Sequence, residues 1–190
     1  MAHKLFILTI LLFAFSVVKA TQLDILGPPG SGSFGKYVVA LPNGNIVVCD
    51  PDYTAPGPIA DVGAVYLYNG GTGALISTLT GNTANDHIGL NNSNDFSSSI
   101  VVLANGNFVV VSPAWTNGAA QAAGAVTWCS GSAGCSGTVS PANSLVGSTA
   151  SDLIGADDNN KRAVIPLKNG NYVVSSRYWH KGALANVGGV

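Results

Sequence analysis

The stretch LPNGNIVVCDPDY (residues 41–53) returns as LANGNFVVVSPAW (103–115) and as LKNGNYVVSSRYW (167–179). The three copies begin 62 and 64 residues apart, and residues 103–126 match residues 167–190 at 12 of 24 positions without a gap. Two shorter markers recur in the same order: Asp-x-(Ile/Leu)-Gly at 24–27, 86–89 and 152–155, and Gly-(Ala/Gly)-Val at 63–65, 124–126 and 188–190. Self-similarity at a fixed period indicates a repeat protein whose units pack on one another.

Each repeat predicts four short strands. In the first repeat, the apolar runs 37–41 and 45–49 flank Asn43-Gly44, and Asn-Gly between two such runs is the strongest short hairpin signal. Residues 63–68 and 74–80 are expected to form a third and a fourth strand around a glycine-rich turn. The second repeat follows with strands at 99–103, 107–111 and 124–129 and a weaker fourth strand around 138–146.

The first two strands of each repeat are apolar on both faces, as in IVVL (100–103) and FVVV (108–111). Such strands must be covered on both sides, and stacked four-stranded sheets supply that cover. The sequence therefore predicts an all-β fold, a β-propeller-type array of four-stranded antiparallel blades. The repeats are expected at about 24–85, 86–151 and 152–190, which makes about two and a half blades.

A propeller closes with four or more blades, so two and a half blades predict an incomplete array with an uncovered apolar face at both ends. Two explanations remain open. The chain is a fragment of a longer reading frame, or it self-associates through its open blade edges, because an unpaired strand edge is a template for another chain.

The glycine-based motifs resemble a known family. Phe34-Gly35, residues 63–66 and the 69–73 turn are similar to FG-GAP repeats, the blades of integrin-α-like propellers. The Asn-Gly-Asn-x-Val-Val and Ser-Pro-x-Trp signatures resemble the variant found in bacterial filamentous-haemagglutinin-like surface adhesins. This resemblance implies a propeller with a role in adhesion.

FG-GAP blades often bind calcium through an Asp-x-Asp-x-Asp-Gly loop between the first two strands. Here the corresponding positions 42–45, 104–107 and 168–171 contain no carboxylate. Calcium takes six to eight oxygen ligands, several of them anionic. The calcium sites of the family are therefore not carried over, and we expect no cofactor.

The first twenty residues predict a secretory signal peptide. Lys4 precedes an uncharged apolar run at 5–18, and Val18-Lys19-Ala20 predicts cleavage before Thr21. The run is shorter than the roughly 20 residues that span a bilayer. We therefore expect a secreted, extracellular or cell-surface protein (21–190) with no membrane span after cleavage.

Charged residues make up 9% of the chain, and all nine acidic residues are Asp. The chain expected after cleavage carries a net charge of about −3, which argues against nucleic acid or an anionic membrane as a partner.

The secreted location permits a disulfide. Cys129 and Cys135 flank a turn that aligns with the turn after Tyr68, and opposed hairpin residues lie within disulfide range. We expect Cys129 and Cys135 to be bonded and Cys49 to be a buried free thiol.

Several polar residues have both a functional and a structural interpretation. Asp24, Asp86 and Asp152 recur once per repeat; they could bind a cation or, as we favour, hydrogen-bond the backbone of their own turns. Asp157 and Asp158 are weak candidates for a calcium loop. Residues 91–93, Asn-Asn-Ser, fit a glycosylation acceptor if the source is eukaryotic.

Aromatic residues Tyr53, Trp115 and Trp179 share one repeat position. They are candidate binding anchors, although packing between blades is the favoured interpretation. Trp128 replaces Leu67 and could pack on the disulfide. His87 and His180 do not recur and no nucleophile motif is present, so the sequence does not predict an enzyme.

The function expected from the sequence is adhesion, or the binding of a protein or glycan through the blade loops. Loops 50–61 and 112–123 differ in sequence, as binding loops do. The alternative is a structural protein that self-assembles through its β-repeats. An enzyme is possible only if its site lies outside these residues.

Overall fold

The structure is a computed structural model that describes residues 22–91, 99–157 and 162–190. All regular secondary structure within these ranges is β-strand. The strands are β1 (Tyr37–Ala40), β2 (Asn45–Asp50), β3 (Ala64–Asn69), β4 (Leu75–Thr80), β5 (Ile100–Val102), β6 (Phe108–Ser112), β7 (Ala125–Cys129), β8 (Gly137–Thr138), β9 (Ser144–Val146), β10 (Val164–Pro166) and β11 (Tyr172–Val174). The first two predicted strands of each repeat are therefore present and pair with one another.

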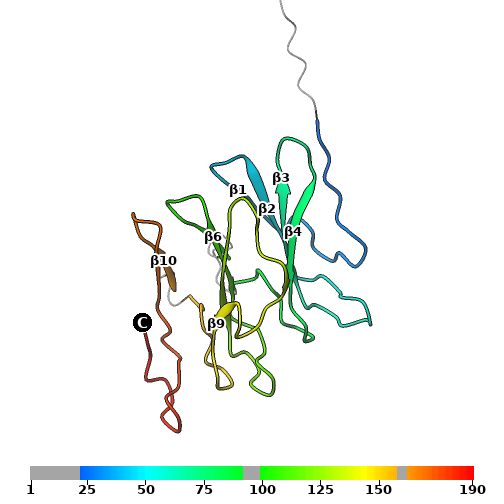
Figure 1. Cartoon of the computed structure of the whole chain (residues 1–190). Helices are drawn as coiled ribbons and strands as arrows, with labels where there is room; N and C mark the ends of the chain where they lie inside the picture. Colours follow the sequence, from blue (N-terminus) through cyan, green and yellow to red (C-terminus); the bar gives the residue numbers. More distant parts are fainter. Residues whose placement is uncertain (1–21, 92–98, 158–161) are drawn as a thin grey trace, which may run out of the picture.

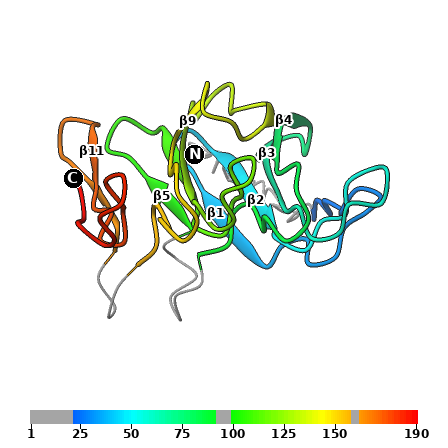
Figure 2. The same ribbon diagram turned by 90° about the horizontal axis from the view of Figure 1, so that it is seen from below.

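These strands form three sheets, one for each repeat (Figure 1). The first has the order β1-β2-β3-β4-β8, the second β5-β6-β7-β9, and the third β10-β11. Within the first repeat the successive strands β1 to β4 pair antiparallel, with β2 opposite β3 from Asn45↔Asn69 to Asp50↔Ala64. The three sheets lie side by side in both views and do not close into a barrel (Figures 1 and 2).

The Asn-Gly dipeptides form the turns between the first two strands of each sheet, as predicted. Gly44, Gly106 and Gly170 have φ angles of 85°, 82° and 86°, a left-handed conformation that favours glycine. The preceding asparagine side chain reinforces each turn. In the first repeat, Asn43 Oδ1 accepts a hydrogen bond from the backbone N–H of Asn45 at 3.1 Å.

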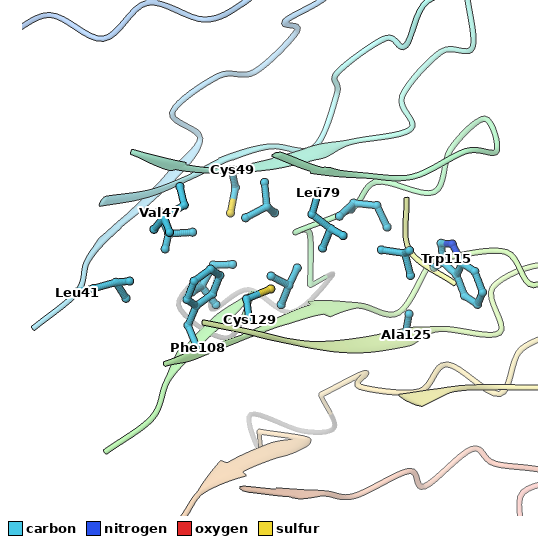
Figure 3. Close-up of a cluster of buried hydrophobic side chains, with 14 residues drawn as sticks. Leu41, Val47, Cys49, Leu79, Phe108, Trp115, Ala125 and Cys129 are labelled. Atoms are coloured by element: carbon cyan, nitrogen blue, oxygen red, sulfur yellow. The ribbon is translucent and has the colours of Figure 1, made fainter. Parts of the chain in front are cut away.

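Hydrophobic side chains fill the two spaces between the sheets. Figure 3 shows the cluster between the first and second sheets, where Val47, Cys49 and Leu79 face Phe108 and Cys129. A second cluster joins the other face of the second sheet to the third sheet. It contains Val101, Leu103, Val109, Val111, Val126, Ile154, Val164 and Val174. The middle sheet is therefore covered on both sides, as its doubly apolar strands require.

The outer face of the first sheet is covered, contrary to the expectation of an uncovered face at both ends. Tyr66 and Tyr68 on this face are only 2% and 6% exposed. Ile25 and Phe34, from the segment that precedes β1, and Tyr53 pack against them. The N-terminal segment thus occupies the position that a preceding sheet would take. The third sheet, in contrast, leaves Ile165 48% and Leu167 39% exposed.

The weak fourth strand predicted for the second repeat is divided between two sheets. β8 pairs in parallel with β4 of the first sheet, with Leu79 opposite Gly137 and Thr80 opposite Thr138. β9 pairs antiparallel with β7 of its own sheet. The polar segment between β8 and β9 therefore crosses from one repeat to the other.

Candidate functional site

Two buried aspartates connect neighbouring repeats. Asp86 and Asp152 belong to the recurring Asp-x-(Ile/Leu)-Gly marker, and both side chains are fully buried. The glycine of each marker has a positive φ angle, and the residue before it forms a parallel bridge with the preceding sheet: Ile88 with Gly63, and Ile154 with Gly124. Each aspartate is thereby fixed at the boundary between two sheets.

Asp86 binds the backbone on both sides of its boundary. Its Oδ2 atom accepts hydrogen bonds from the N–H groups of Asn82 at 3.1 Å and Thr83 at 2.9 Å. Its Oδ1 atom accepts one from the N–H of Thr116, 30 residues away in the loop that follows β6 of the second sheet, at 3.0 Å. The sequence interpretation of a turn-capping aspartate is therefore correct, but it omitted the bond to the following repeat.

Asp152 repeats this arrangement at the next boundary. Its Oδ2 atom accepts hydrogen bonds from the N–H groups of Ser148 and Thr149, both at 2.9 Å. Its Oδ1 atom accepts one from the N–H of His180 at 2.9 Å and lies 2.7 Å from Nδ1 of the same histidine. His180 thus occupies the position of Thr116 and adds a side-chain contact.

The two carboxyl groups differ in their proton affinity. Burial raises the pKa of Asp86 above its usual value, although the hydrogen bonds from Thr83, Asn82 and Thr116 oppose that shift. Burial acts in the same direction on Asp152. There the hydrogen bonds from Thr149, His180 and Ser148 prevail and lower the pKa. The histidine side chain, absent at Asp86, favours the ionised form.

A groove of about 290 Å³ between two repeats is lined by Thr83 and Thr116, whose N–H groups both bond to Asp86. One wall is the turn with Thr83 and Asn85, and the other is the loop with Thr116 and Gln121. The lining also includes Ala84, Ala114 and Ala122. The bonds of Asp86 to both walls fix the width of the groove, which we call the inter-repeat groove.

The backbone of the inter-repeat groove follows one pattern at both boundaries. The N–H of Asn85 donates to the carbonyl of Ala60, and the N–H of Ser151 donates likewise to Gln121. Asn85 and Ser151 both have a φ angle of 64°. A positive φ also recurs at one equivalent loop position of all three repeats, which is occupied by Asp61, Ala122 and Asn186. The repeat thus fixes the loop backbone while the side chains vary.

A second groove, of about 440 Å³, lies between the Asn-Gly turns and is lined by Asn43, Asn105 and Gly131 among others. Its amides are largely engaged within the protein. Asn43 donates to the carbonyl of Gly131 at 2.8 Å, and Asn105 donates to that of Gly170 at 3.4 Å. These bonds join the turns of neighbouring repeats, and we assign this groove a structural role.

The candidate aromatic residues lie at packing positions. Trp115 is 2% exposed and belongs to the cluster between the first two sheets (Figure 3). Tyr53 packs against Tyr66 at 6.4 Å between ring centroids. Trp179 packs, partly buried, against the cluster of the third sheet. Trp115 therefore has a packing role, whereas Tyr53 and Trp179 retain some exposed surface.

The remaining candidate residues are not brought together. Asp24 is exposed and, among the described residues, accepts a hydrogen bond from nearby Gln22 and not from a following repeat, so it is not the structural equivalent of Asp86. Asp157 accepts one from the N–H of Ala163 at 2.8 Å. Asp158, as well as residues 92–93 of the Asn-Asn-Ser sequence, lies outside the described residues. Within the described ranges, no three His, Cys, Asp or Glu side chains gather as metal ligands.

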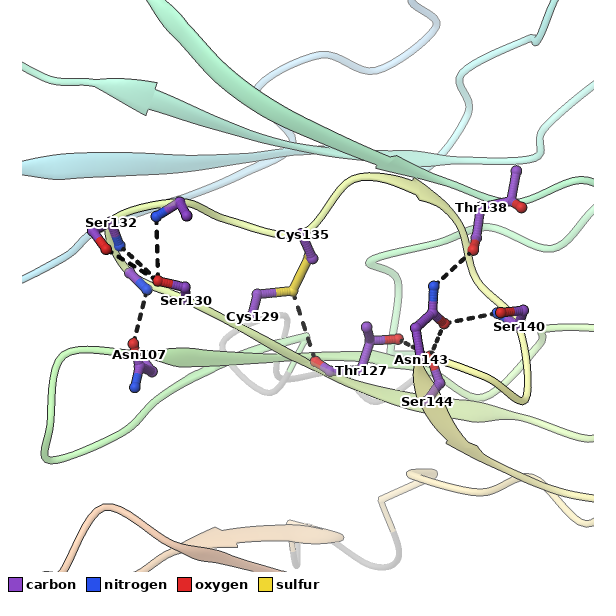
Figure 4. The surroundings of a disulfide bond; sticks show 12 residues. Asn107, Thr127, Cys129, Ser130, Ser132, Cys135, Thr138, Ser140, Asn143 and Ser144 are labelled. Atoms are coloured by element: carbon purple, nitrogen blue, oxygen red, sulfur yellow. Dashed lines mark hydrogen bonds between the residues drawn. A yellow bond between two sulfur atoms is a disulfide. The ribbon is translucent and has the colours of Figure 1, made fainter.

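The expected disulfide is present (Figure 4), and Cys49 is a buried free thiol, as also expected. Cys129 and Cys135 are joined with their Cα atoms 5.0 Å apart. Cys135 packs against the cluster between the first two sheets. Trp128 does not serve the disulfide as expected, since it lies opposite Val109 in the register, on the face turned toward the third sheet.

Residues 40–90, 102–156 and 166–190 match the family described as a repeat of unknown function, DUF5650. The chain belongs to this family. The boundaries of the three DUF5650 repeats agree with the period found in the sequence, and each repeat contributes one sheet. No curated protein matches the chain. Among the residues that the structure describes, no helix is long and apolar enough to cross a membrane.

The groove residues Thr83, Asn85, Thr116 and Gln121 were not predicted as site residues. In the sequence, only the recurring Asp86 could have pointed to the nearby Thr83 and Asn85. The sequence does not show that the loop with Thr116 and Gln121 forms the other wall of the groove. The Asp86 to Thr116 bond supplies this information.

Proposed function

We propose that this chain is a non-catalytic binding module of a secreted or cell-surface protein and that it binds neutral glycans in the inter-repeat grooves. The observation that carries the proposal is the Asp86 groove, whose walls come from two repeats and whose lining side chains are uncharged. The fixed backbone with variable side chains is the arrangement expected of binding loops on a rigid scaffold.

The chemistry of the groove suits sugar hydroxyls. Asn85 and Gln121 are exposed, and their side chains form no hydrogen bond within the part of the chain that the structure describes. Each amide offers donors and an acceptor, and the hydroxyls of Thr83 and Thr116 can do both. A groove without charged lining residues favours a neutral ligand over a phosphate or a metal ion.

A screen of neutral oligosaccharides against the chain from residue 22 tests this proposal. The Gln121→Ala variant should bind an oligosaccharide found in the screen at least about tenfold more weakly than the parent protein does. This is the loss expected when a hydrogen bond to an otherwise unpaired group is removed. Gln22→Ala is the matched control, because Gln22 is exposed and remote in sequence from the groove, and it should leave affinity unchanged. Binding of a protein without any glycan binding, or equal affinity of both variants, would contradict the proposal.

We further infer that the three sheets are blades of a propeller-type array related to FG-GAP repeats. The successive use of opposite sheet faces in the two core clusters supports this inference. Secretion follows from residues 1–20, which lie outside the described residues. N-terminal sequencing of the exported protein should find Thr21 first, and a sequence that starts at Met1 would contradict a cleaved signal.

Self-assembly is the second candidate function, and one observation favours it. Ile165 and Leu167 expose apolar surface on the outer face of the third sheet. If this face pairs between copies, size-exclusion chromatography should show species larger than a monomer, and Ile165→Lys should reduce them to monomers. A monomer at all concentrations would leave binding as the sole function proposed.

A further inference from the structure

We propose that Asn69 is a self-modification site, at which the chain converts this asparagine to aspartate or isoaspartate without an enzyme. The site is the β3–β4 turn, residues 69–74. Its reactants are water and two neighbouring groups of the chain, the side-chain amide of Asn69 and the backbone nitrogen of Gly70. The proposal is independent of the inter-repeat groove and of the glycan binding proposed for it.

The reaction replaces ammonia by water in two steps. The nitrogen of Gly70 forms a bond to Cγ of Asn69, and its proton leaves with the side-chain Nδ2 as ammonia. Water then opens the resulting five-membered imide at either carbonyl carbon, which yields aspartate or isoaspartate. No oxidant or reductant is required. A glycine after the asparagine favours the ring closure, because it has no side chain and the widest backbone freedom.

The chain contains five Asn-Gly dipeptides, and their hydrogen bonds distinguish them. In the hairpins between the first two strands of each repeat, the attacking nitrogen is engaged, because the glycine N–H donates to a backbone carbonyl. These bonds run from Gly44 to Leu41 at 2.9 Å, from Gly106 to Leu103 at 2.9 Å and from Gly170 to Leu167 at 3.1 Å. Attack at these positions requires the turn to open first.

The other two dipeptides differ at the leaving group. At Asn117, the side-chain Nδ2 donates to the carbonyl of Gly147 at 2.8 Å, which holds the amide in place. At Asn69, neither the side-chain Nδ2 nor the N–H of Gly70 donates a hydrogen bond to any residue that the structure describes. The β3–β4 turn therefore leaves both the nucleophile and the leaving group free to react.

The β3–β4 turn also stabilises the charge that develops in the reaction. Attack on Cγ places negative charge on Oδ1 of Asn69, and this atom already accepts hydrogen bonds from the N–H groups of Gly71 at 3.0 Å and Thr72 at 2.9 Å. Two backbone donors directed at a developing oxyanion lower the barrier of acyl transfer. The backbone holds Asn69 in this position, since its N–H donates to Ala74 at 2.8 Å and its carbonyl accepts from Gly73 at 2.7 Å.

The second repeat shows that this pair of donors belongs to the turn of the repeat. The equivalent position is Ser130, whose Oγ accepts hydrogen bonds from the N–H groups of Ser132 at 3.3 Å and Ala133 at 3.2 Å (Figure 4). Serine has no side-chain amide, so the same turn cannot deamidate there. The asparagine of the first repeat is what makes the turn reactive.

The modification changes a turn that packs closely on its neighbour. A Cβ atom added to Gly70 would lie 2.1 Å from the carbonyl oxygen of Gly44, so the two turns leave no space between them at this point. Aspartate adds a negative charge to the uncharged 69–74 segment, and isoaspartate also lengthens the main chain by a methylene group. Modification therefore alters the contact between the two turns of the first sheet.

The test follows deamidation at every Asn-Gly dipeptide in the protein expected after signal cleavage, residues 21–190. After incubation in mildly alkaline buffer, digestion with chymotrypsin places the dipeptides in separate peptides, and mass spectrometry measures aspartate and isoaspartate in each. Asn69 should react at least about tenfold faster than the other four, because its turn stabilises the oxyanion and leaves the nitrogen free. In urea the rates should converge. A rate at Asn69 no higher than the others in the folded protein, or a preference that persists in urea, would overturn the proposal.

A pair of variants tests the N–H donors. Thr72→Pro removes one of the two donors to Oδ1 of Asn69, whereas Thr72→Ala, the matched control, keeps it; both variants lose the threonine hydroxyl. Deamidation at Asn69 should be at least about tenfold slower in Thr72→Pro than in Thr72→Ala. Equal rates in the two variants would also overturn the proposal. The comparison of folded and urea-treated protein needs neither variant, so the proposal stays testable if Thr72→Pro does not fold.

Discussion

The buried aspartates show how a single residue type determines the spacing of the repeats. Asp86 and Asp152 each accept hydrogen bonds from two turn N–H groups and from one N–H of the following repeat. A carboxylate that satisfies several backbone donors is among the stronger polar interactions in a protein. The aspartate thus links neighbouring sheets, while the exposed loop residues near it differ between the repeats.

Replacement of Asp86 by alanine should lower the free energy of unfolding by about 3 kcal/mol, because three buried backbone donors lose their partner. Urea denaturation measures this change. Asp24→Ala is the matched control, since Asp24 is exposed and should have an effect close to zero. Equal stability of the two variants would show that the bond between repeats contributes nothing.

The lowered pKa of Asp152 predicts an acid-dependent loss of stability. A carboxyl group whose pKa is lower in the folded than in the unfolded chain stabilises the fold at pH values above the unfolded pKa, here about 3.8. This contribution should be complete above about pH 5 and decline as the pH falls through the folded pKa. The free energy of unfolding, measured against pH, should therefore fall less steeply below pH 5 in Asp152→Asn than in the parent. Parallel curves for the two proteins would contradict this prediction.

At the scale of elements, the hairpin of the second repeat joins two sheets. It leaves β7, turns through the Cys129–Cys135 disulfide, and places β8 beside β4 of the first sheet before β9 returns (Figure 4). Asn143 supports the crossing by donating to the carbonyl of Thr138 at 2.9 Å. The disulfide thus restrains a segment that contacts both repeats.

Loss of the disulfide should destabilise the protein. The double variant Cys129→Ser, Cys135→Ser should lose about 2 kcal/mol in the free energy of unfolding, since the bond closes a small loop. Urea denaturation checks this value, and full stability of the variant would show that packing alone holds the hairpin.

A thiol count distinguishes the three cysteines. Burial, together with the charge of Asp50, raises the pKa of Cys49 above its usual value and leaves the thiol unreactive in the folded protein. A thiol reagent should therefore detect no cysteine in the native protein and one after unfolding without reductant. Three thiols in the unfolded protein would contradict the disulfide.

At the scale of the whole molecule, the two outer faces of the array differ. The N-terminal segment covers the first face, where the ring of Phe34 lies 5.6 Å from that of Tyr66 and 6.2 Å from that of Tyr68. Backbone bonds hold the segment, since the N–H groups of Gly32 and Ser33 donate to the buried Asp50. The segment therefore contributes to the packing of the first sheet.

Phe34→Ala should uncover the aromatic face and lower the free energy of unfolding by about 2 kcal/mol, less than the 3–5 kcal/mol usual for a fully buried phenylalanine. Leu26→Ala is the control within the same segment, because Leu26 is 84% exposed. Chemical denaturation compares the two variants, and equal stability would show that the first sheet does not need this cover.

The sequence by itself determined the repeat, the hairpins and the pairing of Cys129 with Cys135. These features depend on local rules: glycine accepts the positive φ of the turn, and strands that are apolar on both faces require neighbours on both sides. The patterns behind these rules span a few residues each, and the Asn-Gly turn recurs in all three repeats.

Only the tertiary structure decided the features that depend on how repeats sit against one another. The contact of Asp86 with Thr116, the inter-repeat groove and the cover of the first sheet by Phe34 join segments that no local pattern relates. The division of 138–146 into β8 and β9 has the same origin, because the weakly apolar residues of that segment leave the choice of sheet to the neighbouring β4. Where local preference is weak, packing between repeats determines the structure.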